Sequence, residues 1–281
     1  MSIVRPLRRS ATFCVPQFDL TNDALCAQLK MPPLHAAAKR EAKIQKAADQ
    51  AGLRVGSPRL CLPIRLCGNC GCHRCRRMFQ EAFIRTYAPF LYRDAWRELI
   101  AKLKKAKRPV AITIVPLFGK VPVGGYGMDL KKFINTIRKL LRRLAPKAKG
   151  FFFVDVSQNE PKRGKKGYWQ VHVHGVIWKL SEKAKSRLKA ALKSLGKSVH
   201  KPLLTKHMDD PVGWLAYMAK PNFFRRINTV EEDGGRNITG RPLPPEQEVS
   251  IARWLSRYKV GARFFTIGLG HDLPTSTSIT L

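Results

Sequence analysis

Two apolar runs joined by a polar loop constrain the fold of this chain more than any other feature. The first run is GFFFVDVS, residues 150–157, and the second is YWQVHVHGVIW, residues 168–178. The loop between them, QNEPKRGKKG, is polar and rich in lysine and glycine. Runs of this length and composition are typical of β-strands, and a loop of this kind favours antiparallel pairing. The sequence therefore predicts a hairpin whose second strand is buried.

Strand and helix patterns alternate on both sides of this hairpin. In chain order they are VAITIVPLF (110–118), LKKFINTIRKLLRRLA (130–145), the hairpin, SEKAKSRLKAALKSLG (181–196) and KPLLTK (201–206). Asp129 and Ser181 precede the two helices and are expected to be their N-caps. The order β, α, β, β, α, β is the split βαβ plan of ferredoxin-like domains. We therefore expect an α+β domain with an antiparallel sheet over residues 109–221.

The helix predicted at residues 130–145 is amphipathic. Its apolar side chains share one face and consist of Phe133, Ile137, Leu140, Leu141 and Leu144. Its other faces carry only cations among the charged residues, namely Lys131, Lys132, Arg138, Lys139, Arg142 and Arg143. This pattern predicts a helix that packs on the sheet and turns a cationic side to solvent.

The remaining parts of the chain are expected to flank this domain. Residues 1–108 read as an N-terminal accessory region with helical segments and a cysteine-rich stretch. Within the domain, residues 209–221 favour a short helix with Asp210 as N-cap, because a proline follows at the first helical position. Residues 222–281 read as a C-terminal extension made of a hairpin, a helix and a loose tail.

The cysteine-rich stretch predicts a zinc site. Five of the seven cysteines fall between Cys61 and Cys75, and in a reducing compartment such crowding favours metal binding over disulfides. Two CxxC pairs supply the expected ligands, which are Cys67, Cys70, Cys72 and Cys75. Because these pairs are separated by a single glycine, Cys61 or His73 is an alternative ligand, and Cys14 or Cys26 a more distant one. An iron–sulfur cluster is a lesser alternative.

The charge balance indicates a polyanionic partner. Lys and Arg number 53 against 19 Asp and Glu, so the formal net charge is +34, far more than solubility requires. With 44% hydrophobic residues the chain is not a disordered basic tail. It shows neither an apolar run of membrane-spanning length nor a signal peptide, so we expect a cytoplasmic protein with no membrane partner. A complete nucleotide-binding loop and the zinc deaminase pattern are also absent from the sequence.

Two histidines stand one residue apart in the second strand of the hairpin. Residues two apart in a strand face the same way, so His172 and His174 share one face, while Val171, Val173 and Val176 are expected on the other. Taken alone, such a pair is more often two satisfied buried polar groups than a metal site. Ligation requires neutral imidazoles, so any metal-dependent activity should fall below about pH 6.

The hairpin geometry suggests a third ligand. A turn centred near Arg163 and Gly164 sets Asp155 opposite His172 and within reach of both rings. Two imidazoles and a carboxylate can hold a divalent cation and leave coordination positions open, as catalytic sites do. Glu160, in the loop, is the alternative third ligand if the register is shifted.

The helix predicted at residues 209–221 contains the segment YMAK. Tyr217 and Lys220 are three residues apart and lie on one side of a helix. An amphipathic helix with an interfacial tyrosine explains the segment without any catalytic role. Beside a metal site, however, the same helix would bring a nucleophile to the cation.

These segments resemble the motifs of the HUH endonucleases, the enzymes of rolling-circle replication initiators. The likeness rests on AITIVP for the first motif, DVSQNE with GYWQVHVHGVIW for the second and YMAK for the third, and covers about residues 109–221. The second motif is the specific one. The third motif has a single tyrosine here, whereas some initiators carry two.

The resemblance implies single-strand DNA nicking and strand transfer at a replication origin of a phage or plasmid, in a prokaryotic or phage-infected cell. Mg²⁺ or Mn²⁺ would sit on His172, His174 and Asp155, and Tyr217 would form a 5′-phosphotyrosine while Lys220 positions the phosphate. Host replication proteins are possible partners. The residues expected to contact single-stranded DNA are Lys131, Lys132, Arg138, Lys139, Arg142, Arg143, Lys165, Lys166, Tyr168, Trp169 and Trp214.

Two alternatives remain open from the sequence. A single-tyrosine transposase or a mobilisation relaxase would use the same chemistry in another biological setting. A zinc-stabilised nucleic-acid-binding protein without catalysis would make the histidine pair and YMAK coincidental.

Overall fold

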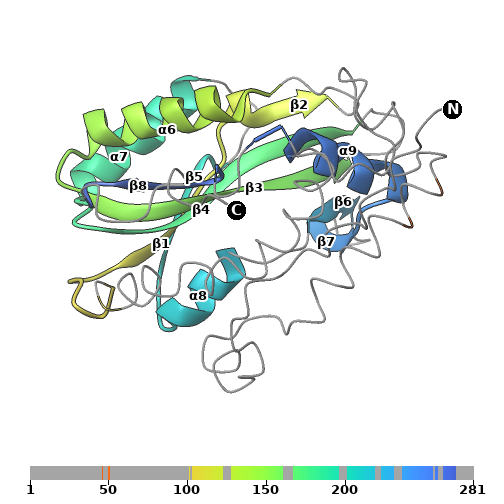
Figure 1. Cartoon of the computed structure of the whole chain (residues 1–281). Coiled ribbons are helices and arrows are strands. Elements are labelled where there is room, and N and C mark those ends of the chain that lie inside the picture. The colour runs from red at the N-terminus through yellow and green to blue at the C-terminus, as the bar shows by residue number, and fades with distance from the viewer. Residues whose placement is uncertain are drawn as a thin grey trace, which may run out of the picture.

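The described part of the chain folds into an α+β structure around one sheet (Figure 1). The computed structural model describes residues 103–122, 128–160, 167–195, 201–218, 223–230, 236–255, 257–258 and 262–269, with the single positions 46, 50 and 101. The elements are β1 (Val110–Ile114), η1 (Leu117–Gly119), β2 (Lys120–Pro122), α6 (Leu130–Leu144), β3 (Lys149–Glu160), β4 (Tyr168–Trp178), α7 (Glu182–Ser194), β5 (Leu203–His207), α8 (Pro211–Met218), β6 (Phe224–Val230), β7 (Arg236–Pro242), α9 (Pro245–Leu255) and β8 (Phe264–Ile267). The predicted N-terminal accessory region, with its cysteines, lies almost wholly outside the described residues.

The hairpin of β3 and β4 is the longest pairing in the sheet. It runs without interruption from Lys149 opposite Trp178 to Asn159 opposite Tyr168. Both strands combine aromatic and β-branched residues, which suit a pleated, buried surface. The antiparallel hairpin predicted from the sequence is confirmed.

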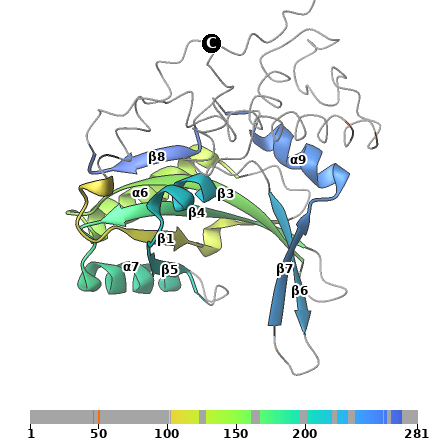
Figure 2. The same ribbon diagram turned by 90° about the horizontal axis from the view of Figure 1, so that it is seen from below.

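The other strands add to both sides of this hairpin. The strand order is β5-β1-β4-β3-β6-β7, while β2 also pairs with β4 and β8 also pairs with β3. Among the described strands the pairings are antiparallel except that of β3 with β6, so the sheet is mixed. Figure 2 shows the strands twisting across the molecule and the β6–β7 hairpin projecting beyond the others. The α+β prediction is confirmed.

Helices α6 and α7 cover one face of the sheet (Figure 1). Asp129 accepts hydrogen bonds from the backbone N–H groups of Lys131 and Lys132, and Ser181 from that of Ala184, so both predicted caps are confirmed. The predicted apolar face of α6 is buried apart from its last residue, which is partly exposed; the buried members are Phe133, Ile137, Leu140 and Leu141. They pack against strand residues that point to this face, including Val154, Val171 and Val173.

Helix α8 lies on the opposite face, over a smaller apolar cluster (Figure 1). Phe151, Val176, Trp178 and Met218 belong to this cluster. The placement of Val176 differs from the sequence prediction. Because side chains alternate along β4, Val176 shares the face of the histidines and not that of Val171.

The C-terminal segments are part of the same sheet and core. The predicted hairpin is present as β6 and β7, and β6 pairs with β3. The sequence did not predict β8, which pairs with the other end of β3. Trp254 of α9 and Phe265 of β8 pack in the same cluster as α6. The domain boundary predicted between residues 221 and 222 remains a prediction.

No helix in the part of the chain that the structure describes is long and apolar enough to cross a bilayer.

Gly175, next to the histidine pair, has no room for a side chain. A Cβ atom there would overlap the Phe152 ring and lie 2.8 Å from the carbonyl oxygen of Phe151. The Phe152 ring cannot easily move, because it stacks on Phe265 with ring centroids 5.0 Å apart. We expect Gly175→Ala to lower the free energy of unfolding by about 1–3 kcal/mol, as overpacking does, measured by urea denaturation.

Gly240→Ala is the matched control. A Cβ atom at Gly240 would make ordinary contact with Phe224 at 3.8 Å. Its effect should stay within about 0.5 kcal/mol. Equal losses in the two variants would contradict the packing described at Gly175.

Candidate metal centre

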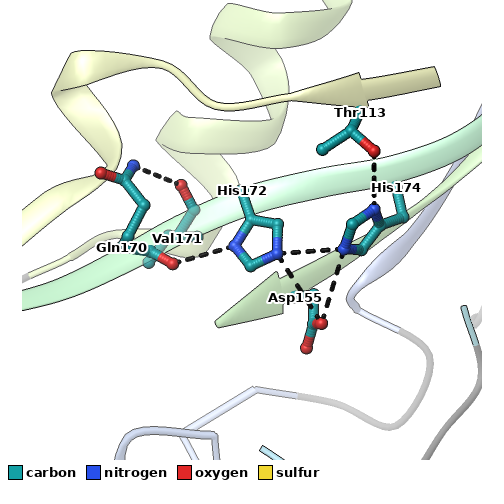
Figure 3. A network of polar contacts seen from close by, with 6 residues as sticks. All are labelled: Thr113, Asp155, Gln170, Val171, His172 and His174. Carbon is teal, nitrogen blue, oxygen red and sulfur yellow. Dashed lines mark hydrogen bonds and ion pairs between the residues drawn. The ribbon is translucent and has the colours of Figure 1, made fainter. Parts of the chain in front are cut away.

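Three buried ligand-type side chains meet at the centre of the β3–β4 hairpin (Figure 3). Asp155 is 4% exposed, His172 3% and His174 5%. Their ligand atoms all lie within 4.8 Å of one another. Strand alternation places the two imidazoles on one face of β4, and the pairing of Asp155 opposite His172 brings the carboxylate to the same place, as the sequence predicted.

The distances within the group suit a shared cation. The Nε2 atoms of His172 and His174 are 3.0 Å apart, and Asp155 Oδ2 lies 3.8 Å from the first and 3.7 Å from the second. Two ligand atoms held about 2.1 Å from one ion and at right angles to each other would be about 3.0 Å apart. The separation of the two Nε2 atoms therefore matches two ligands of one ion.

A backbone carbonyl fixes the tautomer of His172. Its Nδ1 atom lies 3.0 Å from the carbonyl oxygen of Gln170. A carbonyl oxygen only accepts hydrogen bonds, so Nδ1 of His172 carries the hydrogen and donates it. In the neutral ring the Nε2 atom, which faces Asp155 and His174, then presents a lone pair. This is the usual arrangement of a metal-ligating histidine.

Thr113 of β1 plays the corresponding part for His174. Its Oγ1 atom lies 2.9 Å from Nδ1 of His174 (Figure 3), and β1 pairs Thr113 directly with His174. A hydroxyl can donate or accept, so two neutral states exist. If Thr113 accepts, both Nε2 atoms present lone pairs to the same point. If Thr113 donates, His174 donates in turn to His172 and the chain of hydrogen bonds is complete without a cation.

The donor set can hold a metal ion. Two neutral imidazoles and a carboxylate suit divalent cations, and three protein ligands leave positions for water or a substrate. The ligands come from two directly paired strands, so little side-chain movement is needed to gather them.

Helix α8 places an aromatic pair beside His174. The ring centroids of His174 and Tyr217 are 5.4 Å apart, and Trp214 stacks on Tyr217 with centroids 5.0 Å apart and an interplanar angle of 20°. Trp214 also donates from Nε1 to the carbonyl oxygen of Gly175, at 2.9 Å, which ties α8 to β4. Tyr217 is 39% exposed. A phenol ring therefore borders the ligand group and remains accessible from solvent.

The alternative third ligand, Glu160, lies elsewhere. It is five residues beyond Asp155 in β3, so strand alternation turns it to the other face. Its Oε1 atom lies 3.2 Å from Nη1 of Arg225. The structure thus groups Asp155, and not Glu160, with the histidines. Lys220, Lys165, Lys166 and the predicted zinc ligands lie outside the described residues.

The predicted DNA-contacting residues are distributed over both faces. Trp169 does not join the site: it is 7% exposed and packs in the core under α6 and α9, because odd-numbered residues of β4 point away from the histidines. Its stacking role on DNA is therefore corrected. Tyr168 is half-buried, with Lys120 Nζ 4.1 Å from its ring centroid.

The cations of α6 are exposed except Arg138. The guanidinium of Arg138 lies 5.3 Å from the ring centroid of Phe265. Burial, with a further contribution from the like charge of Arg142, lowers the pKa of Arg138. The exposed members are Lys131, Lys132, Lys139, Arg142 and Arg143.

Sequence reasoning missed Thr113. The sequence contains an indication of its role, since Thr113 is a polar residue within the apolar strand AITIV. Its role depends on the register of β1 against β4, which pairs Thr113 with His174 and was not predicted.

No family model, curated protein or solved structure matches the chain.

Removing the Thr113 hydroxyl should weaken metal binding. Thr113→Val keeps the shape of the side chain but leaves Nδ1 of His174 without this partner, and loss of such a support typically costs about 10–100-fold in metal affinity. Thr113→Ser should retain the affinity. Isothermal titration of the full chain with Mn²⁺ measures both.

Thr205→Val is the matched control, because Thr205 lies on the neighbouring strand β5 opposite Ile112. It should bind Mn²⁺ as the unmodified chain does. Equal affinities for the two valine variants would show that Thr113 does not support the site.

Proposed function

We propose that this protein is a metal-dependent HUH endonuclease that nicks single-stranded DNA through a phosphotyrosine intermediate and so initiates rolling-circle replication. The observation that carries the proposal is the position of Tyr217. Its ring centroid lies 5.4 Å from that of His174, and His174 belongs to a group of three buried side chains that could hold a metal ion. A phenol beside such a group is the arrangement that tyrosine attack on a phosphodiester requires.

The arrangement of strands supports this assignment. The elements β1, α6, β3, β4, α7 and β5 follow the order of a split βαβ domain, and their strands lie side by side as β5-β1-β4-β3. This is the ferredoxin-like plan that the resemblance to HUH endonucleases implies. The histidine pair on a central strand and the tyrosine on a later helix support the proposed likeness to the second and third motifs.

In the proposed mechanism His172, His174 and Asp155 hold Mg²⁺ or Mn²⁺. When bound, the cation supplies Lewis-acid polarisation of the scissile phosphodiester. The Gln170 carbonyl holds His172 in the tautomer that presents Nε2, and Thr113 supports the same tautomer of His174 when its hydroxyl accepts from Nδ1.

Tyr217 carries out the covalent step. Its phenolic oxygen forms a bond to phosphorus and loses its proton, while the bond from phosphorus to the 3′-oxygen breaks and that oxygen takes up a proton. The products are a 5′-phosphotyrosine and a free 3′-hydroxyl. Because the tyrosyl ester retains the bond energy, a 3′-hydroxyl can reverse the step without ATP. Lys220 is proposed to neutralise charge on the transferred phosphate.

A non-catalytic nucleic-acid-binding protein is the second candidate. It is favoured by the second tautomer of His174, in which Thr113, His174, His172 and the Gln170 carbonyl form a continuous hydrogen-bonded chain. In that state the imidazoles are satisfied buried polar groups and require no cation.

A covalent adduct assay separates the two candidates. A pool of random-sequence single strands, labelled at the 3′ end, is incubated with the full chain and Mn²⁺, denatured and resolved by electrophoresis. We expect labelled protein from 3′-labelled strands and none from 5′-labelled strands, because Tyr217 retains the fragment downstream of the nick. Tyr217→Phe should abolish the adduct. Tyr258→Phe should not, because the hydroxyl of Tyr258 contacts Met128 and Leu130 and has no part in the proposed chemistry. An adduct that survives Tyr217→Phe excludes this nucleophile, and no adduct at all favours the second candidate.

His172→Ala tests the metal requirement. It should abolish the adduct yet leave salt-sensitive DNA binding within about twofold, since Lys and Arg supply most of the affinity. His207→Ala is the matched control, because His207 is an exposed histidine of β5 that contacts Asp209. Loss of DNA binding in His172→Ala alone would identify the histidines as structural.

A further inference from the structure

A strongly cationic surface lies on the face of the sheet opposite the candidate metal centre, on α6 and α7. We propose that the outer surface of α6 and α7 binds the phosphate backbone of double-stranded DNA, separately from the single strand at Tyr217. The proposal does not depend on the nicking chemistry, since it concerns residues that contribute nothing to the metal centre.

The two surfaces are separated by the sheet itself. Helices α6 and α7 pack on the face that carries Val154, Val171 and Val173. The metal ligands and α8 lie on the other face, with Val176 and Trp178. Figure 1 shows α6 and α7 together on one side of the sheet and α8 on the other. A DNA strand held at Tyr217 therefore cannot also lie along α6 unless it passes around the edge of the sheet.

Helix α6 presents an unbroken cationic side. It contains no acidic residue. One line of cations about 16 Å long runs along the helix. It consists of Lys132, Lys139, which is seven residues further on, and Arg143, which is four residues beyond that. Lys131 and Arg142 lie on an adjacent line. These five cations are exposed, and the like charge of Arg142 adds to burial in lowering the pKa of Arg138. An anionic partner would relieve this repulsion.

Helix α7 continues the surface. Its exposed cations are Lys183, Arg187, Lys189 and Lys193. Its only acidic residue is Glu182, which pairs with the partly exposed Lys185 at 3.4 Å. The cations of the two helices therefore far outnumber the acids that could neutralise them. A solvated face that serves only solubility has no need for charges of one sign over two adjacent helices.

The composition of this surface favours a duplex over a single strand. Proteins that hold unpaired nucleic acid usually add aromatic side chains on which bases stack. No aromatic side chain of α6 or α7 is exposed: Phe133 is the sole aromatic residue of the two helices and is buried. The accessible aromatic pair, Trp214 and Tyr217, belongs to the opposite face. A rigid cationic helix without stacking residues matches the backbone of a duplex, where phosphates are regularly spaced and bases are covered.

The test uses the full chain and a 20-base-pair duplex of arbitrary sequence, without added divalent cation. The variant Lys139→Gln/Arg142→Gln/Arg143→Gln changes exposed residues only, and circular dichroism with thermal unfolding checks that it folds as the unmodified chain does. We expect its affinity for the duplex, measured by fluorescence anisotropy, to fall at least about tenfold at 100 mM salt, with a log–log salt slope shallower by about 2–3, or 0.9 for each lost phosphate contact.

Lys104→Gln/Lys105→Gln/Lys107→Gln is the matched control. It removes the same number of exposed charges beside Leu103, which packs in the cluster on the metal-centre face. It should bind the duplex within about twofold of the unmodified chain, since its lysines lie away from α6. Equal losses in the two triple variants would show that net charge, and not this surface, binds DNA, and no loss in the α6 variant would also overturn the proposal.

A single strand of the same length completes the test. The α6 variant should lose more affinity for the duplex than for the single strand; equal losses would contradict the assignment to a duplex. Tyr217→Phe should bind the duplex as the unmodified chain does. If the adduct assay fails, the result for the duplex still stands. The proposed nicking activity and the proposed duplex-binding surface can therefore be refuted separately.

Discussion

The register of β3 against β4 is the constraint on which the candidate centre depends. Asp155 faces His172 only because eleven consecutive residue pairs hold the two strands in this alignment. A slip by one residue would turn the carboxylate to the helical face, among the apolar side chains under α6. The aromatic and β-branched residues of both strands favour this alignment, since a slip by one residue would move each of them to the opposite face. The core that stabilises the fold thus also positions the candidate metal ligands.

Burying the three side chains of the candidate centre has an electrostatic cost that hydrogen bonds offset. An ionised carboxylate and two imidazoles removed from water require hydrogen bonds or a cation. The Gln170 carbonyl and the Thr113 hydroxyl each satisfy one ring nitrogen, and the inner nitrogens face Asp155. A divalent cation would satisfy all three inner atoms at once. This is why the same geometry can be a resting hydrogen-bonded chain or a loaded metal centre.

Most of the structure near the hairpin could be predicted from local sequence patterns. Strand alternation and the symmetry of the loop predict the pairing of Asp155 with His172. Helical periodicity and capping residues, which act over equally short stretches of chain, predict the two faces of α6 and the caps at Asp129 and Ser181. What could not be predicted arises from contacts between distant segments. The hydrogen bond of Thr113 needs the register of β1 against β4, and the burial of Trp169 needs α9, which lies some eighty residues further along the sequence.

Strand β8 has a consequence for the order of assembly. Phe264–Ile267 covers the edge of β3 next to the segment that carries Asp155, and its residues are among the last described. During synthesis, the hairpin that holds the ligands must leave the ribosome with this edge open, and an open, apolar strand edge readily pairs with another chain. The nascent protein would benefit from a chaperone, or from the repulsion between its own many cations, until β8 arrives.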